Sequence, residues 1–207
     1  MSTNIDKNSA LFIKTKMIEQ YKTIKDSRWI KLNIKNSKFH GRIYNVTSLV
    51  DVNTILKQVE VEFRKTTHIV YAYRLIDGDS IREYATDAGE PTHSSGPPIL
   101  KVLEGYKLLN VLLVVVRYFG GIKLGIGGLI KAYTEAARKA VKESRIVTKT
   151  NKKLMLIKTN YRELSEMLYK IEQMQGKVIE INHGKNVKIK ALIPISFSKR
   201  FDNKELD

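Results

Sequence analysis

Two polar, glycine-bearing segments hold the residues of this sequence that could do chemistry. The first, residues 86–98, offers two carboxylates, an imidazole and two hydroxyls, on Asp87, Glu90, His93, Ser94 and Ser95. Carboxylate and imidazole groups can bind a divalent metal, and a serine near a histidine can act as a nucleophile. The spacing is not that of a known hydrolase, and the sequence has no Gly-x-Ser-x-Gly elbow. We therefore expect no metal, no catalytic residue and no cofactor.

The second segment, residues 119–128 (FGGIKLGIGG), is half glycine. Glycines allow close approach of a ligand or a second backbone, and the start of a following helix offers free N–H groups to an anion. The spacing is neither that of a Walker loop nor that of a dinucleotide fold. The residues that could bind a phosphate or a polyanion are Arg117, Gly120, Gly121, Lys123, Gly125, Gly127, Gly128 and Lys131.

A structural alternative for the same glycines stays open. They could simply allow a tight strand-to-helix turn, with Asp87 or Glu90 pairing with Arg117 or Lys123.

The charge of the chain favours a polyanionic partner. Among 207 residues, 37 Lys and Arg stand against 21 Asp and Glu, a formal net charge of +16 that is spread along the whole chain. Such a field attracts nucleic acid and makes its binding depend on salt. The alternative is that a lysine-rich surface serves only solubility.

Other protein classes are excluded by what the sequence lacks. It has no cysteine, so disulfides, thiolate metal sites and cysteine nucleophiles are ruled out. Residues 1–16 show no apolar core of signal-peptide length, and the longest apolar run, residues 111–116, is too short to cross a bilayer. We expect a cytoplasmic protein with no membrane contact.

Hydrophobic periodicity outlines the elements that must position the two segments. Residues 1–27 form an N-terminal extension with one amphipathic helix, through Leu11, Met17, Ile18 and Tyr21. The pattern then predicts a hairpin over residues 29–46, a helix over 49–63 capped by Thr47 or Ser48, and a second hairpin over 69–85. His68 precedes a strand and is expected to be a hydrogen-bonded structural histidine.

The second half of the chain predicts two units. A helix over residues 99–106, a strand buried on both faces over 111–118 and an Ala-rich helix from Gly128 complete the first. The polar residues 144–151 suggest a domain boundary. Beyond it come a strand, a helix and two more strands, which predict a small α+β sandwich.

Three blocks of residues resemble the IMPACT family (YigZ-like proteins). Residues 87–100, DAGEPTHSSGPPIL, resemble its signature D-D-G-E-P-x-x-[ST]-[AS]-G-x-P-I-L, and residues 117–133 resemble R-Y-F-G-G-x-x-L-G-x-G-G-L-x-x-A-Y. Ala88 departs from a commoner Asp and His93 from a commoner Gly. The loop signature comprises Asp87, Gly89, Glu90, Pro91, His93, Ser94, Ser95 and Gly96. A third block provides residues that are structural or line the site, His68, Tyr71 and Tyr73.

The resemblance implies an α+β protein of two domains. Residues 28–146 would form an IMPACT-like βα sandwich similar to the second domain of ribosomal protein S-five, and residues 152–207 a ferredoxin-like module similar to domain V of elongation factor G. Family members are implicated in translational control. Together with the charge of +16 and the glycine-rich segment, this resemblance implies a non-enzymatic regulator that binds RNA or the ribosome through a basic, glycine-rich groove, with a possible protein partner. The alternatives are an enzyme acting on a small phosphorylated or peptide substrate in the same cleft, or a protein–protein adaptor.

Overall fold

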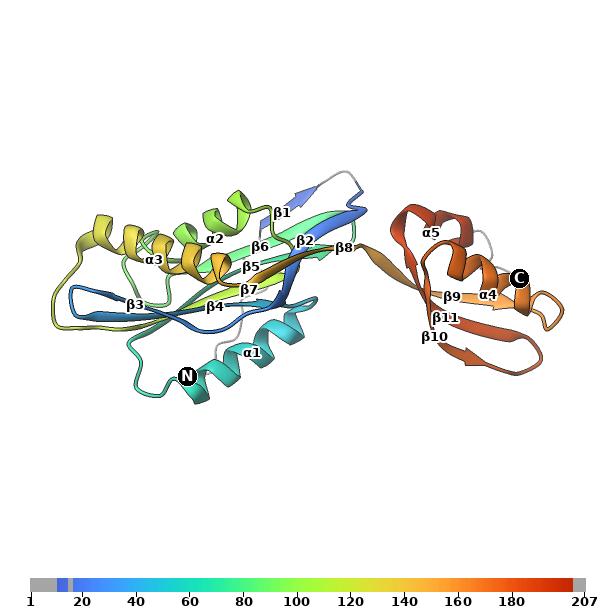
Figure 1. Ribbon diagram of the computed structural model, residues 1–207, viewed down its shortest axis with the longest axis horizontal. Coiled ribbons are helices and arrows are strands. Elements are labelled where there is room, and N and C mark those ends of the chain that lie inside the picture. The colour runs from blue at the N-terminus through green and yellow to red at the C-terminus, as the bar shows by residue number, and fades with distance from the viewer. Residues whose placement is uncertain (1–10, 15–16, 203–207) are drawn as a thin grey trace. The chain divides into compact units, whose positions relative to one another are not determined.

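The computed structural model describes residues 11–14 and 17–202, which fall into two compact units (Figure 1). The first unit contains residues 11–14 and Lys22–Thr148, and the second contains residues 17–21 and the described residues from Lys149 onward. Each unit has a hydrophobic core of its own. The fold is α+β, as the sequence predicts.

A six-stranded antiparallel sheet forms the centre of the first unit, in the order β1-β6-β5-β7-β4-β3. Its strands are β1 (Leu11–Lys14), β3 (Ile30–Ile34), β4 (Ser37–Asn45), β5 (His68–Asp77), β6 (Ser80–Thr86) and β7 (Val111–Tyr118). Both predicted hairpins are confirmed, as β3–β4 and β5–β6. Residues 111–116 of β7 are fully buried, which explains their unbroken apolar run, because helices cover both faces of the sheet.

Helix α1 (Leu49–Glu62) covers one face of this sheet, and α2 (Gly96–Gly105) and α3 (Gly125–Lys142) cover the other (Figure 1). Ser48 caps α1 as predicted, in a capping box with Asp51. Helix α3 buries its alanines against the sheet, and a Cβ on Gly41 of β4 would lie 3.3 Å from the carbonyl oxygen of Ala136. Small side chains at this contact therefore let α3 lie close to the strands.

The local structure differs from expectation in two segments. Residues 11–14 and 20–26 are strands β1 and β2 (Gln20–Asp26), so the predicted amphipathic helix is wrong. The polar segment 144–151 contains the division between the two units, after Thr148, but it is mostly strand β8 (Arg145–Thr150), which pairs with β2. Strands β2 and β8 are largely exposed and lack the alternating apolar pattern that identifies a strand from sequence, and their pairing joins residues over a hundred positions apart.

The described residues of the second unit have the element order β-α-β-β-α, the first five elements of the β-α-β-β-α-β ferredoxin-like motif, and its three-stranded sheet has the order β10-β11-β9. Ile171 of α4 and Phe201 of α5 pack on one face of the sheet, with Ile157, Ile189 and Ile193. The predicted strand, helix and two strands are confirmed. The elements are β9 (Lys152–Thr159), α4 (Leu164–Gln173), β10 (Lys177–Asn182), β11 (Val187–Pro194) and α5 (Ile195–Asp202).

Candidate functional site

Asp87 organises the first polar loop, between β6 and α2. Its carboxylate accepts hydrogen bonds from the backbone N–H groups of His93, Ser95 and Gly96 at 2.7, 2.9 and 2.9 Å, and from the Ser95 hydroxyl at 2.7 Å. Burial raises the pKa of this carboxyl, but the hydrogen bonds from Ser95, Gly96 and His93 outweigh it and hold the pKa below its ordinary value. Asp87 is therefore ionised, and its hydrogen bonds hold the loop in its conformation.

Three other residues of the loop signature, Gly89, Ser94 and Gly96, also have structural roles. A Cβ on Gly96 would lie 2.5 Å from the carbonyl oxygen of Thr86, so only glycine fits there. The Ser94 hydroxyl donates to the carbonyl oxygen of Pro91 at 2.5 Å, and Gly89 has φ +84. The two departures from the family signature, Ala88 and His93, have φ of 46° and 61°. Both lie in the left-handed region, where a side chain costs conformational energy.

Glu90 connects this loop to β7, the strand that precedes the glycine-rich segment 119–128. Arg117 Nη1 donates to both carboxylate oxygens of Glu90, at 2.7 and 2.9 Å, and the Tyr133 hydroxyl donates to Glu90 Oε1 at 2.6 Å. Glu90 is 8% exposed and Arg117 4%. Burial, followed by the hydrogen bond to Glu90, raises the pKa of Tyr133, so that its hydroxyl stays protonated and donates.

His68 stands at the edge of this buried pair. Its Nδ1 lies 2.9 Å from the carbonyl oxygen of Ala88, which can only accept, so Nδ1 carries the proton. Its Nε2 lies 3.9 Å from Glu90 Oε2. Tyr71 and Tyr73 are elsewhere, buried in the core on the α1 side of the sheet, with Tyr73 stacked on Tyr84. His68 is thus part of the cluster, whereas Tyr71 and Tyr73 are core residues.

Arg117 is an interior residue of this cluster. Besides Glu90, its guanidinium contacts the Ser37 hydroxyl at 3.3 Å and lies over the ring of Phe39. The open alternative from the sequence, a carboxylate of the first loop paired with Arg117, is the geometry that the structure has. Because the guanidinium is turned inward and buried, it is not placed to contact a polyanion directly.

The glycines after β7 have different reasons to be glycine. A Cβ on Gly120 would lie 2.1 Å from the carbonyl carbon of Asn36, so the loop passes directly over the β3–β4 turn. Gly121 and Gly125 have φ of +83° and +70°, which lets the chain turn into α3. Gly127 and Gly128 are already helical, since α3 begins at Gly125, and no side chain caps its first turn. Lys123 and Lys131 extend from this region and are exposed.

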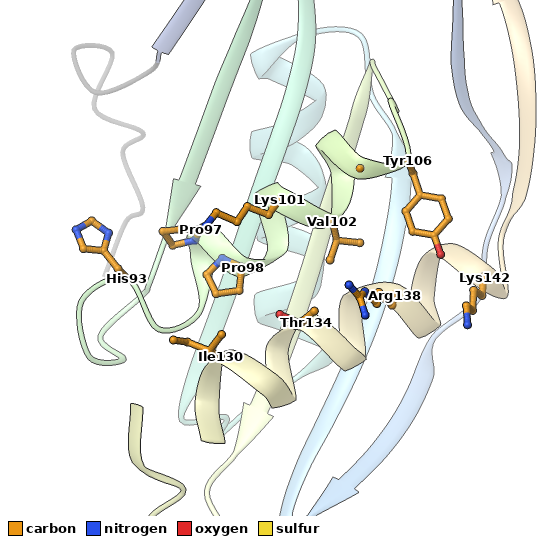
Figure 2. Close-up of a pocket in the computed structure, with 11 residues that line it drawn as sticks. His93, Pro97, Pro98, Lys101, Val102, Tyr106, Ile130, Thr134, Arg138 and Lys142 are labelled. Atoms are coloured by element: carbon orange, nitrogen blue, oxygen red, sulfur yellow. The ribbon is translucent and has the colours of Figure 1, made fainter. Parts of the chain in front are cut away.

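A groove of about 820 Å³ lies between α2 and α3 (Figure 2). Its basic residues are Lys101 from α2 and Arg138 and Lys142 from α3, and the described residues that line it include no carboxylate. The other lining residues are His93, Pro97, Pro98, Val102, Gly105, Tyr106, Ile130 and Thr134. Figure 2 shows Ile130, Thr134 and Arg138 in a row along α3.

Sequence reasoning did not select the basic residues of this groove. The available signal is that Ile130, Thr134, Arg138 and Lys142 recur every four positions, which places them on one face of a helix. Which helix lies opposite that face depends on tertiary packing.

The structure gives no sign of a metal centre or a membrane segment in the described residues. No group of three or more His, Cys, Asp or Glu side chains there could hold a metal ion, and no described helix is long and apolar enough to cross a membrane.

Comparisons with known proteins agree with this architecture. Residues 35–141 match the family model of the Impact N-terminal domain. The chain belongs to the IMPACT family. Two bacterial IMPACT family members are similar over most of their length. YvyE of Bacillus subtilis is 29% identical over 86% of this chain and 81% of its own, and YigZ of Escherichia coli is 27% identical over 84% and 86%. A crystal structure described as that of a hypothetical protein covers 91% of this chain and 92% of its own, with 25% identity and a TM-score of 0.70.

Proposed function

We propose that this IMPACT family protein is a non-enzymatic, translation-linked regulator that binds RNA or the ribosome through the basic groove between α2 and α3. The observation that carries the proposal is the lining of the groove, which has Lys101, Arg138 and Lys142 and no carboxylate among its described residues. A phosphate backbone is attracted by clustered cations. Glu135 lies with Arg138 and Lys142 at an adjoining hollow on α3, but it does not line this groove. Lys123 and Lys131, exposed near the start of α3, extend the basic surface.

The state of the two loop carboxylates supports a binding role over a catalytic one. A general acid or base must reach the substrate directly or through one water. Asp87 instead accepts four hydrogen bonds within its own loop, and Glu90 is buried against Arg117 and Tyr133. Both carboxylates hold the loops in place. Neither is available for catalysis, so the adjacent groove is better suited to binding.

The link to translation comes from the family, whose members are implicated in translational control. The charge of +16 on 207 residues fits a partner as anionic as the ribosome. A protein partner in the same process would act together with the RNA contact.

The test is to measure binding of fluorescently labelled transfer RNA and of ribosomes across a salt series. The test variant combines Lys101→Glu with Arg138→Glu in the groove. The control combines Lys25→Glu with Lys57→Glu, which makes the same change in net charge at exposed residues outside the groove. We expect the test variant to lose at least about tenfold in affinity. Its salt dependence should also be shallower, by about 0.7–0.9 for each phosphate that the groove no longer neutralises.

Equal effects of the two double variants would mean that net charge, and not the groove, attracts RNA. If neither transfer RNA nor ribosomes bind the unaltered protein at low salt, the proposed function is wrong.

A second candidate, a protein–protein adaptor, is favoured by the second unit. One face of its sheet leaves Leu154, Leu156 and Ile179 exposed, at 52%, 46% and 49%. Exposed aliphatic groups gathered on one face are typical of a protein contact. If a protein partner still copurifies after RNase treatment, replacing Leu154 and Leu156 with serine should abolish its copurification. Retention of that partner would rule this surface out as its binding site.

A further inference from the structure

A second hollow lies in the first unit on the α1 side of the sheet, where β3, β4 and β7 come together. Its volume is about 610 Å³. It combines two cations, two amides, an imidazole and two aromatic rings. None of the residues that the sequence predicted to bind a polyanion lines it. The lining residues are Lys31, Asn33, Asn36, Lys38, His40, Tyr118 and Phe119.

Strand register places the five lining residues that lie in strands in rows on a single face, whereas Asn36 lies in the β3–β4 turn and Phe119 follows the end of β7. Asn33 of β3 is opposite Lys38 of β4, and Lys38 is opposite Tyr118 of β7, so these three residues form one row across three strands. The next row contains Lys31 opposite His40. Residues directly opposite each other in paired strands point to the same side of the sheet. The hollow is therefore an open sheet surface with an aromatic ring beside lysine and asparagine.

Phe119 provides an exposed ring at the edge of this surface. It is 46% exposed, although a large apolar side chain gains by being buried. Its position is fixed nonetheless: its backbone N–H donates to the Thr67 hydroxyl at 3.0 Å, and the Arg117 guanidinium lies 5.5 Å from the ring centroid. Arg117 is itself held by Glu90. The ring is thus presented to solvent by the buried cluster.

His40 adds an uncharged ring. Burial, and then the charges of Lys31 and Lys38, lower the pKa of His40, against a smaller opposing effect of Glu62. Its ring contacts those of Tyr118 and Phe63, at centroid distances of 6.0 and 5.3 Å. The lysines next to it remain exposed.

We propose that this surface binds an unpaired nucleotide of single-stranded RNA. The base would stack on Phe119, beside Tyr118, while Asn33 and Asn36 pair with its edge through amide donors and acceptors and Lys31 and Lys38 hold the phosphates. Aromatic platforms flanked by cations bind single strands with little sequence preference. The bases of an A-form duplex are stacked inside and cannot reach such a platform. This inference rests on the proposed RNA binding and adds to it a contact that only strands with unpaired bases can make.

The experiment compares two fluorescein-labelled RNAs by anisotropy, a mixed single strand of about ten nucleotides, within the usual site size, and a blunt duplex of the same sequence. Phe119→Leu removes the aromatic face and keeps an apolar side chain. The matched control is Ile122→Leu, on the same loop and 47% exposed. We expect Phe119→Leu to weaken single-strand binding by about tenfold, with duplex binding unchanged. Ile122→Leu should change neither.

A third variant separates stacking from charge. Lys38→Ala should lower the salt slope for the single strand by about 0.7. Thermal unfolding of every variant shows that each is folded.

The outcomes distinguish this inference from the proposed function. If Phe119→Leu and Ile122→Leu bind the single strand equally well, the nucleotide site is refuted. The proposed function would survive that result, provided that Lys101→Glu with Arg138→Glu still weakens binding of transfer RNA and ribosomes. If the unaltered protein binds neither labelled RNA, the nucleotide site is refuted, whereas the proposed function is decided by the transfer RNA and ribosome titrations.

Discussion

The buried Glu90–Arg117 pair is the feature whose removal should have the largest effect on stability. The side chains are 3% and 5% exposed and the shortest contact is 2.7 Å. Replacing Glu90 with leucine leaves the guanidinium buried without its counter-charge, which costs about 3–5 kcal/mol. The Tyr133 hydroxyl also loses its acceptor, at a cost of about 1–3 kcal/mol if it finds no other. We therefore expect Glu90→Leu to destabilise the first unit by about 4 kcal/mol, near the lower end of the combined range.

The single tryptophan makes this loss measurable for one unit alone. Trp29 lies in the first unit, against Phe63 and Tyr44, so its fluorescence during urea denaturation reports the unfolding of that unit. With a urea slope of about 2 kcal/mol per molar, a loss of about 4 kcal/mol lowers the midpoint by about 2 M. Glu90→Gln, which keeps the shape and one acceptor oxygen, should shift the midpoint less.

A double variant tests whether the pair is the cause. Arg117→Met added to Glu90→Leu removes the unpaired cation, and a buried ion pair replaced by apolar residues of similar size often regains stability. The double variant should therefore be more stable than the sum of the two single losses predicts. Simple additivity of the two losses would refute the reasoning, because it would mean that Glu90 and Arg117 contribute independently.

Three further predictions concern the loops. His93→Gly should stabilise the first unit by about 0.5–1 kcal/mol, because φ is 61° there, and the same urea titration measures it. Gly120→Ala should cost several kcal/mol through its clash with Asn36, whereas Gly127→Ala, with open space around its Cβ, should be neutral or stabilising by about 0.5 kcal/mol; similar results for both would contradict the structure. Because the pKa of Asp87 is lowered in the folded state, its stabilising effect is present above the ordinary carboxyl pKa and lost as pH falls through the folded value. Asp87→Asn should flatten that loss of stability in acid, followed by Trp29 fluorescence, and an unchanged acid profile would exclude Asp87 as a contributor.

The sequence was sufficient for elements whose signals are local. A cap at Thr47 or Ser48 was predicted for the helix over residues 49–63, and Ser48 caps α1; the hairpin predicted over residues 69–85 is β5–β6. The pairing of β2 with β8 was missed because it depends on partners far apart in sequence and on strands with little apolar alternation.

The candidate site divides in the same way. The sequence predicted that a carboxylate of the first loop, Asp87 or Glu90, could pair with Arg117 or Lys123, and only the structure shows that the pair is Glu90 with Arg117. The groove could not be predicted, because Lys101 meets Arg138 only once α2 packs beside α3. The row of Asn33, Lys38 and Tyr118 requires the register between β4 and β7, which are separated by more than sixty residues.

The buried cluster and the surface are physically connected through Arg117. One side chain binds Glu90 of the first loop, contacts Ser37 at the β3–β4 turn and lies against the exposed ring of Phe119. Gly120, one residue further, passes over Asn36 so closely that the turn and the loop cannot move independently. A substitution at Glu90 should therefore disturb Phe119 even though the two residues belong to different loops. The buried carboxylate of Glu90 thus helps to position Phe119 through Arg117 without contacting the RNA itself. Loss of RNA binding in a Glu90 variant would therefore reflect the position of Phe119 and not a lost contact between Glu90 and RNA.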